Sequence, residues 1–182
     1  MNKGKNHQNW IIEGYQLVAS QGFGTVNIES TARALGKSKS SFYHYFGDWQ
    51  GFEESLLNHH IERARAFAHE VMECEEIIPD LVHLLIDYKT DFFFHKQLRI
   101  NRERPEFKTC FEQVHALFEK AVIDQWVAFL SLQDRPFLAA QTLRLISENF
   151  LLQITEEHYD FEWLKNYLQE ASGLVLSMKT KP

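Results

Sequence analysis

The sequence predicts an all-α protein, and three observations support this fold class. Apolar residues recur at alternating spacings of three and four through most of the chain, which is the period of one helix face. No segment shows the alternation of apolar and polar residues that marks a half-buried strand. Near the N-terminus, two short helical stretches flank Gly36, as in two helices joined by a tight turn. The chain is therefore predicted to divide into a small helical domain, residues 1–51, and a larger helical domain, residues 52–182.

The small domain is predicted to contain three helices with recognisable ends. Asn27 can cap the second helix and Ser38 the third, because a side-chain oxygen there accepts a hydrogen bond from a free backbone N–H. Gly36 lies between these two helices, where a tight turn favours a residue without a Cβ. The last two helices thus form a helix-turn-helix.

The third helix has two different faces. Phe42 and Phe46 lie four residues apart and form its buried stripe. The exposed polar residues of the helix are Lys39, Ser40, Ser41 and His44. In a helix-turn-helix, the start of the second helix lies in the major groove of DNA, where polar side chains contact base edges. We therefore predict that these four side chains face bases, while Tyr43 and Tyr45 mostly contact phosphates.

The same segment resembles a known family. Its first helix and the glycine that ends it are matched by Trp10, Ile11, Gly14, Leu17 and Val18, followed by Gly22 and Phe23. The other matching residues are Ile28, Ala32, Gly36, Ser38 and the run from Phe42 to Phe46. From Trp10 to about Phe52, the sequence resembles the N-terminal DNA-binding domain of the TetR family of bacterial regulators. We transfer the DNA-binding positions of the family to this sequence one by one and add the polar face of the third helix. The predicted DNA-binding residues are then Asn27, Lys37, Lys39, Ser40, Ser41, Tyr43, His44, Tyr45 and Trp49.

Thr31 and Lys37 stand where the family usually has an isoleucine and an apolar residue. Two further positions remove favourable charges that the family pattern would place on the DNA face. Glu29 stands where a basic residue is common, and Trp49 stands where a phosphate-binding lysine usually opens the fourth helix. The resemblance implies a ligand-responsive transcriptional regulator that binds double-stranded operator DNA as a homodimer, a repressor released by a small effector. The two differences keep an alternative open, namely a helix-turn-helix relative with weak or lost DNA binding that acts as a ligand-binding or interaction protein.

The distribution of charge agrees with this division of the chain. The whole chain has a formal net charge of −6. Residues 1–51 carry five basic and three acidic side chains, a net charge of +2, so the remainder carries −8. Attraction to phosphate is local, because salt screens charges beyond about 8–10 Å. The small positive excess near the third helix predicts weaker nonspecific DNA binding than that of a strongly basic repressor.

The larger domain is predicted to consist of long helices. Asp48 and Asp160 can cap the first and the last of them. Pro105 and Pro136 can open the third and fourth, because proline is tolerated in a first helical turn. The predicted spans are about residues 49–73, 78–100, 105–129, 136–154 and 161–178.

The last two of these helices are apolar on more than one face. A surface helix needs only one apolar stripe, so a second stripe indicates a second partner. In a helix-turn-helix protein this partner is usually another copy, since two half-sites need two recognition helices. The resemblance also implies a four-helix dimer bundle, and the predicted interface residues are Leu138, Leu145, Leu152, Trp163, Tyr167 and Leu174. The alternative is that both stripes are buried within one subunit.

The middle helices are rich in aromatic residues with a few polar ones among them. Such a mixture is typical of a ligand pocket between helices, and it is also typical of a plain packed core. The resemblance implies an effector site in this region. The predicted pocket residues are Tyr88, Phe92, His95, Phe111, His115, Phe118 and Trp126, and the predicted ligand is a small hydrophobic or aromatic effector.

Other classes of protein find little support in the sequence. There is no Gly-rich phosphate loop, nucleophile motif or pair of carboxylates tied to a cleft, so we do not expect an enzyme, although catalytic groups can lie far apart in sequence. The nine histidines form no compact ligand motif, so no metal or other cofactor is predicted. Cys74 and Cys110 are expected to be reduced thiols. A polar N-terminus and the lack of a membrane-length apolar run predict a cytoplasmic protein.

Overall fold

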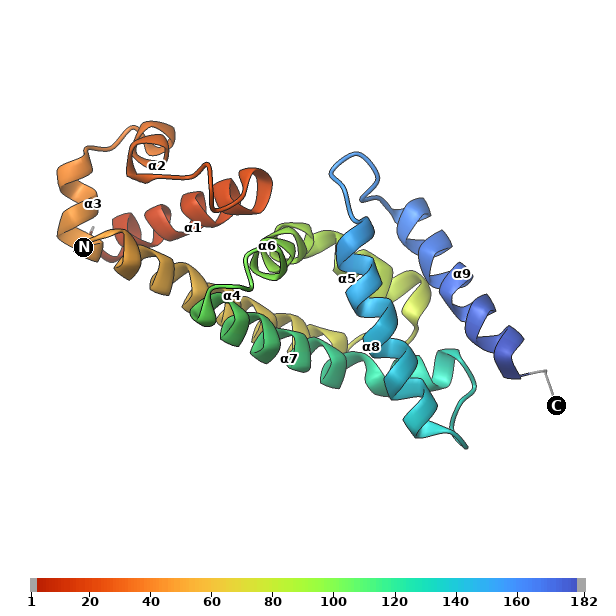
Figure 1. Cartoon of the computed structure of the whole chain (residues 1–182). Coiled ribbons are helices and arrows are strands. Elements are labelled where there is room, and N and C mark those ends of the chain that lie inside the picture. The colour runs from red at the N-terminus through yellow and green to blue at the C-terminus, as the bar shows by residue number, and fades with distance from the viewer. Residues whose placement is uncertain (1–2, 180–182) are drawn as a thin grey trace. The chain divides into compact units, whose positions relative to one another are not determined.

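The computed structural model describes residues 3–179, which fold into helices and loops without any strand (Figure 1). The elements are α1 Lys3–Gln21, α2 Ile28–Leu35, α3 Lys39–Phe46, α4 Trp49–Val71, a π-helical turn Ile77–Leu81, α5 Val82–Asp87, α6 Lys89–Ile100, α7 Pro105–Phe129, α8 Pro136–Gln153 and α9 Phe161–Lys179. The predicted all-α class is confirmed.

The described chain forms two compact units. Unit 1 consists of Met1–Arg63 and Thr90–Val114, and unit 2 consists of Ala64–Lys89 and His115–Pro182. Helices α4 and α7 each contribute residues to both units. These are units of packing, whereas the boundary after residue 51 is a proposed division of function.

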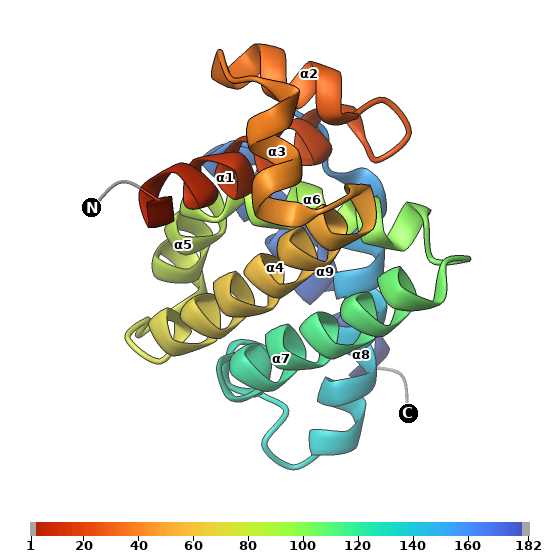
Figure 2. The same ribbon diagram turned by 90° about the vertical axis from the view of Figure 1, so that its left-hand side faces the viewer.

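Unit 1 is built around aromatic residues from α1, α3 and α4. The side chains of Trp10, Phe42 and Phe52 are completely buried. The Phe42 ring lies 5.4 Å from Trp10 and 5.1 Å from Phe52, edge to face in both pairs. Helix α2 packs on α1 and α3 in the same unit (Figure 2). This core holds the helix-turn-helix on the long first helix.

Gly14 of α1 is required by this packing. A Cβ at that position would overlap the ring of Phe52. The glycine lets the α1 backbone approach the aromatic core closely, so its role is space and not backbone freedom.

The predicted helix from about residue 78 to residue 100 is wrong, because the structure divides it into three elements. Ile78 has φ −123° and ψ 117°, outside the helical region, since a residue before proline disfavours the α conformation. A second break lies at Tyr88, with φ −96° and ψ 19°. The buried Tyr88 side chain packs on Phe67 and donates a hydrogen bond to Glu70 at 2.5 Å. The break between α5 and α6 thus falls at a residue whose side chain is anchored in unit 2.

The other predicted helices agree with the structure closely. Helix α4 ends at Val71, two residues before the predicted end, and α7 covers the predicted span from Pro105 to Phe129. Asp48 and Asp160 both act as caps, accepting hydrogen bonds from the backbone N–H groups of Gly51 at 2.8 Å and Trp163 at 2.9 Å.

The core of unit 2 joins α7, α8 and α9. The indole N–H of Trp126 donates to the hydroxyl of Thr142 on α8 at 3.2 Å, and both residues are buried. Tyr159, in the loop before α9, donates its hydroxyl hydrogen to the carbonyl of Leu85 at 2.9 Å. The Trp126 indole and the Tyr159 hydroxyl are thus paired where elements of this unit meet.

Candidate nucleic-acid interface

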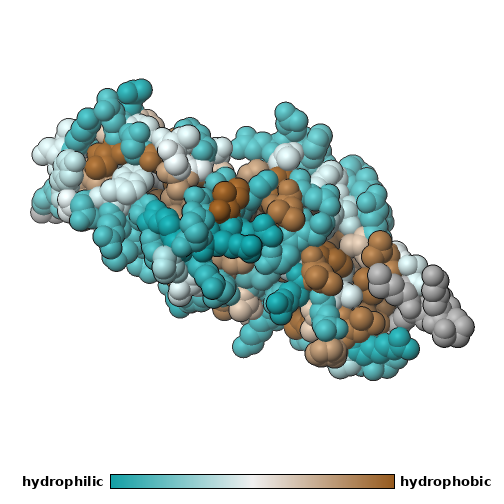
Figure 3. Space-filling view, in the orientation of Figure 1, coloured by the Kyte–Doolittle hydropathy of each residue, from teal (hydrophilic) through white to brown (hydrophobic). Residues whose placement is uncertain are grey.

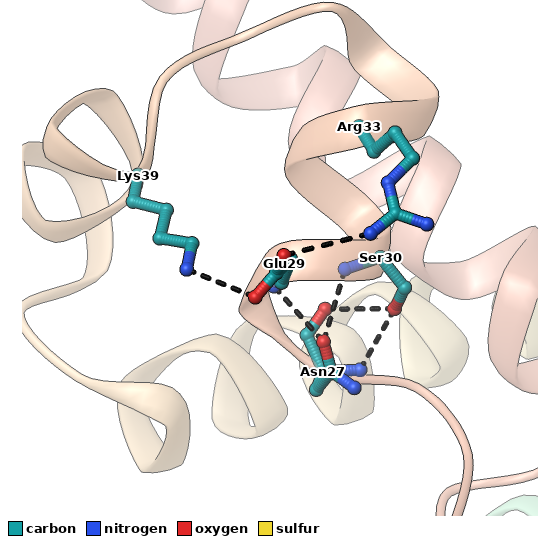
Figure 4. A network of polar contacts seen from close by, with 5 residues as sticks. All are labelled: Asn27, Glu29, Ser30, Arg33 and Lys39. Carbon is teal, nitrogen blue, oxygen red and sulfur yellow. Dashed lines mark hydrogen bonds and ion pairs between the residues drawn. The ribbon is translucent and has the colours of Figure 1, made fainter.

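Helix α2 begins at a complete capping box. The side-chain oxygen of Asn27 accepts hydrogen bonds from the backbone N–H groups of Glu29 and Ser30, both at 3.0 Å (Figure 4). In return, the Ser30 hydroxyl oxygen accepts from the backbone N–H of Asn27 at 3.0 Å. The predicted cap is confirmed, and it commits the Asn27 oxygen to the helix start. The amide nitrogen is the group of Asn27 suited to a phosphate contact.

The turn between α2 and α3 has the predicted geometry. Gly36 lies in the left-handed region with φ 60° and ψ 34°, where glycine is favoured. The backbone N–H of Lys37 then donates to the Ala32 carbonyl at 2.9 Å. The Ser38 hydroxyl accepts from the backbone N–H of Ser41 at 3.3 Å and caps α3, as predicted. These local bonds set the direction in which α3 leaves the turn.

The inner face of α3 is aromatic and anchored. Besides the completely buried Phe42, Phe46 packs edge to face on Phe52 at 4.8 Å. Burying a phenylalanine side chain stabilises the fold by about 1.5–3 kcal/mol. The helix is therefore fixed by one face, and its other face is turned away from this core.

The outer face of α3 carries the side chains predicted to contact DNA. Lys39, Ser40, Tyr43 and His44 are exposed, and Tyr43 keeps 53% of its surface in contact with solvent. Ser41 and Tyr45 are half-buried, and the Tyr45 ring lies 5.8 Å from the ring of His7 on α1. Lys37 is exposed in the turn. The structure thus places most of the predicted polar set on one accessible helix face.

Lys39 has a partner that the sequence interpretation did not foresee. Its ammonium lies 3.0 Å from a carboxylate oxygen of Glu29, across the turn (Figure 4). The other oxygen of Glu29 lies 3.5 Å from the guanidinium of Arg33. The hydrogen bond from Lys39 is the main reason why the pKa of Glu29 is lowered, with the Lys39 and Arg33 charges adding to it. Lys39 is therefore paired with an acid on α2.

Trp49 packs against the aromatic core. Its half-buried ring lies 5.4 Å from the ring of Phe52 and is nearly parallel to Phe42 at 6.3 Å. Gly51 allows α4 to start beside α3, because a Cβ there would overlap the carbonyl oxygen of Phe46. Trp49 thus covers the end of the α3 aromatic face.

A buried polar network in unit 1 was missed by the sequence analysis. The hydroxyl of Tyr15 donates to Asp91 at 2.9 Å and lies 2.6 Å from Nδ1 of His60. Arg63 donates to both oxygens of Asp91, at 3.0 Å and 2.9 Å. Nε2 of His60 lies 3.2 Å from Nδ1 of His95. One network thus links α1, α4 and α6.

The directions of these hydrogen bonds follow from chemistry. Complete burial lowers the pKa of His60 to about 3, so its ring is neutral near pH 7. Because Tyr15 gives its only hydroxyl hydrogen to Asp91, His60 must donate from Nδ1 to the tyrosine oxygen. Nε2 of His60 is then an acceptor, and His95 donates to it. Asp91, which precedes three phenylalanines on a buried helix face, was the signal available in the sequence.

The residues predicted to line one effector pocket fall in both units. In unit 1, Phe92, His95 and Phe111 are buried, and His95 stacks on Phe111 at 4.5 Å. Unit 2 contains the remainder of the set, Tyr88, His115, Phe118 and Trp126, all of them buried. His115 lies 3.2 Å from the Ser147 hydroxyl. All seven predicted residues are therefore buried, three in unit 1 and four in unit 2.

The residues predicted to form a dimer interface lie on α8 and α9 in unit 2. Leu145, Leu152 and Leu174 are 71%, 57% and 61% exposed, so the second apolar stripe is not covered within the described chain. Figure 3 shows hydrophobic side chains over α8 and α9 on the face turned to the viewer. The half-buried members of the predicted set are Leu138, Trp163 and Tyr167.

Trp163 and Tyr167 are held in place along α9. Their rings stack at 5.5 Å, and the Tyr167 hydroxyl donates to the Ile146 carbonyl at 2.7 Å. Phe137 on α8 and Leu176 on α9 are two further exposed apolar side chains, and neither was predicted.

Two further observations concern the described part of the chain as a whole. Within it, no group of three or more His, Cys, Asp or Glu side chains is arranged to hold a metal ion. None of the helices that the structure describes has the length and apolar character needed to cross a membrane.

Comparison with known proteins identifies the fold. Among solved structures, the chain is similar to a protein from Rhodococcus sp. described as a TetR-family transcriptional regulator, with a TM-score of 0.60. The similarity covers 94% of this chain and 99% of the other, at 17% sequence identity. The chain has the TetR-family fold. No family model and no curated protein matches the sequence, so the likeness to the TetR-family regulator is one of structure.

Proposed function

We propose that this chain is a ligand-responsive, DNA-binding transcriptional regulator of the cytoplasm, a repressor released from its operator by a small hydrophobic effector. The observation that carries the proposal is the two-faced helix α3. Phe42 fixes it to the core, while Ser40, Tyr43 and His44 stand exposed on the TetR-like helix-turn-helix. A helix held in this way can present the same polar pattern to DNA each time it docks.

In this proposal, different residues of the helix-turn-helix contact the bases and the backbone of the DNA. Ser40, Ser41 and His44 read base edges, where one good contact discriminates by about 1–3 kcal/mol. Lys39 joins them after leaving Glu29. The residues proposed to position the helix on the DNA backbone are Asn27, Lys37, Tyr43, Tyr45 and Trp49.

A homodimer would supply the second recognition helix. The exposed leucines on α8 and α9 form an apolar face that a second copy could cover. Two half-sites on DNA lie about 34–36 Å apart, one helical turn, so the dimer would have to hold two copies of α3 at that spacing. The dimer interface then sets which operators can be bound.

The effector is proposed to act through the aromatic residues of the middle helices. An allosteric ligand needs unequal affinity for two states, and a coupling of about 1–3 kcal/mol suffices to release DNA. Ligand binding near Phe92, Phe111 or Phe118 would favour a state in which the two recognition helices no longer match the operator spacing.

The DNA-binding proposal is tested by fluorescence anisotropy with the DNA upstream of the chain's own operon. A Ser40→Ala/His44→Ala variant should select a different sequence from a randomised pool. Tyr43→Phe should weaken binding to all sequences alike, because it removes a phosphate contact. Unchanged sequence selection by the double variant would show that these residues do not read the bases.

A second candidate function is favoured by the pairing of Lys39 and by the packing of Trp49. Glu29 neutralises a charge on the proposed DNA face, and Trp49 packs on Phe42 and Phe52 where the family usually places a lysine. These features support a helix-turn-helix relative with weak or lost DNA binding that acts through a ligand or partner. A Trp49→Lys variant that binds DNA more tightly, with a salt dependence steeper by about one ion, would favour the regulator. A Trp49→Lys variant that melts at a lower temperature and binds DNA no more tightly would favour the helix-turn-helix relative with weak or lost DNA binding.

A further inference from the structure

The ion pair between Glu29 and Lys39 brings an acid to the helix face proposed to meet DNA. Lys39 is the first residue of α3, and its ammonium lies 3.0 Å from the carboxylate of Glu29 near the start of α2 (Figure 4). Both side chains are more than half exposed. The first residues of a recognition helix lie in the major groove. A carboxylate so close to the Lys39 ammonium therefore lies beside the groove as well.

The fold gives little reason for this ion pair. Exposed ion pairs contribute little to stability, and the start of α2 is already capped by Asn27 and Ser30. The turn between the two helices is set by Gly36 in its left-handed conformation. On the DNA face, a carboxylate also repels phosphate. A contact between Glu29 and the bases would account for its position.

The ion pair offers a donor group and an acceptor group side by side. An ammonium carries three N–H donors, and an ionised carboxylate only accepts. The hydrogen bond from Lys39, followed by the charges of Lys39 and Arg33, lowers the pKa of Glu29, so this carboxylate is ionised at neutral pH. Its other oxygen lies 3.5 Å from the guanidinium of Arg33. Each carboxylate oxygen can accept more than one hydrogen bond, so Glu29 keeps the capacity to contact a base.

A G·C base pair presents the complementary groups in the major groove. Guanine offers the acceptors N7 and O6, and cytosine offers the donor N4. O6 and N4 are hydrogen-bonded to each other, at about 2.9 Å for a bond of this kind. The 3.0 Å between the Lys39 ammonium and the Glu29 carboxylate matches that separation. An A·T pair presents an acceptor, a donor, a second acceptor and then the thymine methyl group, so it lacks the two adjacent acceptors that suit an ammonium.

We propose that Lys39 and Glu29 together read one G·C base pair in each operator half-site. Lys39 turns its N–H donors to O6 and N7 of guanine, and the carboxylate oxygen that it leaves accepts from N4 of cytosine. Glu29 is then a specificity-determining residue, because at another base pair the opened ion pair finds no full replacement. The inference rests on the proposed function, since it concerns the same face of the helix-turn-helix.

The test begins with sites that the unchanged full chain selects from a randomised pool of double-stranded DNA. We expect the enriched half-site to require a G·C pair at one position. Replacing that pair by A·T in the enriched site should weaken binding by about tenfold in fluorescence anisotropy, a usual size for one mismatched base pair. The ratio of the two affinities is the quantity to compare among variants, because removal of an acidic charge also raises the affinity for every sequence.

The first variant, Glu29→Gln, removes the carboxylate and keeps its shape. An amide side chain suits adenine and not cytosine, so the affinity ratio at this base pair should fall to about twofold or less. Preferences at the other positions of the site should stay. Glu54→Gln is the matched control, since it removes one acidic charge at an exposed position of α4, and it should keep the full ratio. A merely structural role of Glu29, as a favourable charge near a helix start, would leave the ratio unchanged in both variants.

The second variant, Lys39→Met, tests the other half of the contact. It keeps a long side chain and removes the N–H donors, so the preference for guanine should be lost at the same base pair. Both substitutions are at exposed positions, and circular dichroism should show the helix content of the unchanged chain. The double variant Glu29→Gln/Lys39→Met should lower the ratio no further than a single variant does, because the two residues contact one base pair and their effects are not additive.

Three results would overturn the inference and leave the proposed function standing, because the chain would still select a DNA sequence. The first is an enriched site without a required G·C pair. The second is a Glu29→Gln variant that keeps the full ratio. The third is a loss of preference at different base pairs in the two single variants. If the unchanged chain enriches no sequence at all, the proposed function and this inference fail together.

Discussion

Unit 1 contains two ion-pair networks that have the same kinds of partner and opposite surroundings. Glu29, Lys39 and Arg33 form one of them on the surface of the helix-turn-helix, in full contact with water. Asp91, Arg63 and Tyr15 form the other, in which the carboxylate and the tyrosine are buried. Water screens the first network and is excluded from much of the second. Burial thus separates charges that hold the fold from charges that remain available to another molecule.

The largest effect on the free energy of unfolding is expected from a substitution in the buried network of Asp91, Arg63 and Tyr15. Asp91→Asn removes the charge that Arg63 and Tyr15 both face, and we expect it to lower the free energy of unfolding by about 3 kcal/mol. This value lies at the low end for a broken buried pair, because the Arg63 side chain is 37% exposed. Urea denaturation followed by circular dichroism measures it.

Glu54→Gln is the matched control for this change. Glu54 is exposed on α4 in the same unit and takes part in none of the ion pairs described here. The control should unfold at the urea concentration of the unchanged chain. An Asp91→Asn variant that is equally stable would show that burial does not make the second network structural.

An intermediate effect on the stability of the fold is expected from lowering the pH. The pKa of His60 is about 3 in the folded chain because of burial, against about 6.5 for an unfolded histidine. Between these two values the unfolded chain binds the extra proton, so stability falls as the pH falls from about 6.5 towards 3, by about 1.4 kcal/mol per unit for one proton. Above pH 6.5 this histidine contributes no pH dependence.

Comparison with His60→Gln isolates this proton from the others. Tyr15, Arg63, Asp91, His59 and His95 all face or adjoin His60, and the variant keeps every one of them. Urea midpoints at pH 7, 6 and 5 should fall more steeply for the unchanged chain than for the variant. Parallel curves would mean that His60 is already protonated in the folded chain.

The smallest effect on stability is expected at the surface network. Glu29→Gln should leave the melting temperature almost unchanged, because exposed ion pairs contribute little to the fold. It should raise DNA affinity severalfold at low salt and steepen the salt dependence by about one ion, since Lys39 becomes free for phosphate. Glu54→Gln changes the net charge by the same amount and should show neither effect. Fluorescence anisotropy at several salt concentrations checks both variants.

What the sequence could predict was mainly local. The caps at Asn27 and Ser38, the turn at Gly36 and the buried face of Phe42 all depend on neighbours within a few residues, and the structure confirms them. Prolines at 105 and 136 likewise mark helix starts, because their effect on the backbone is local.

The features that were missed depend on partners far apart in the sequence. Tyr15 meets Asp91 across 76 residues, and no periodic pattern records that meeting. Lys39 meets Glu29 only because the turn folds α3 back beside α2. The break at Ile78 was different, since Pro79 stood in the sequence and its effect on the preceding residue was overlooked.

The contact between Gly14 and Phe52 has an evolutionary consequence. Any side chain at position 14 would occupy the space of the Phe52 ring, so position 14 can become larger only if the ring moves or the residue at position 52 becomes smaller. We expect the two positions to covary among related chains: a larger residue at position 14 should occur together with a smaller one at position 52. A larger residue at position 14 with Phe52 unchanged would move α1 away from α4, and with it the surface on which α3 rests.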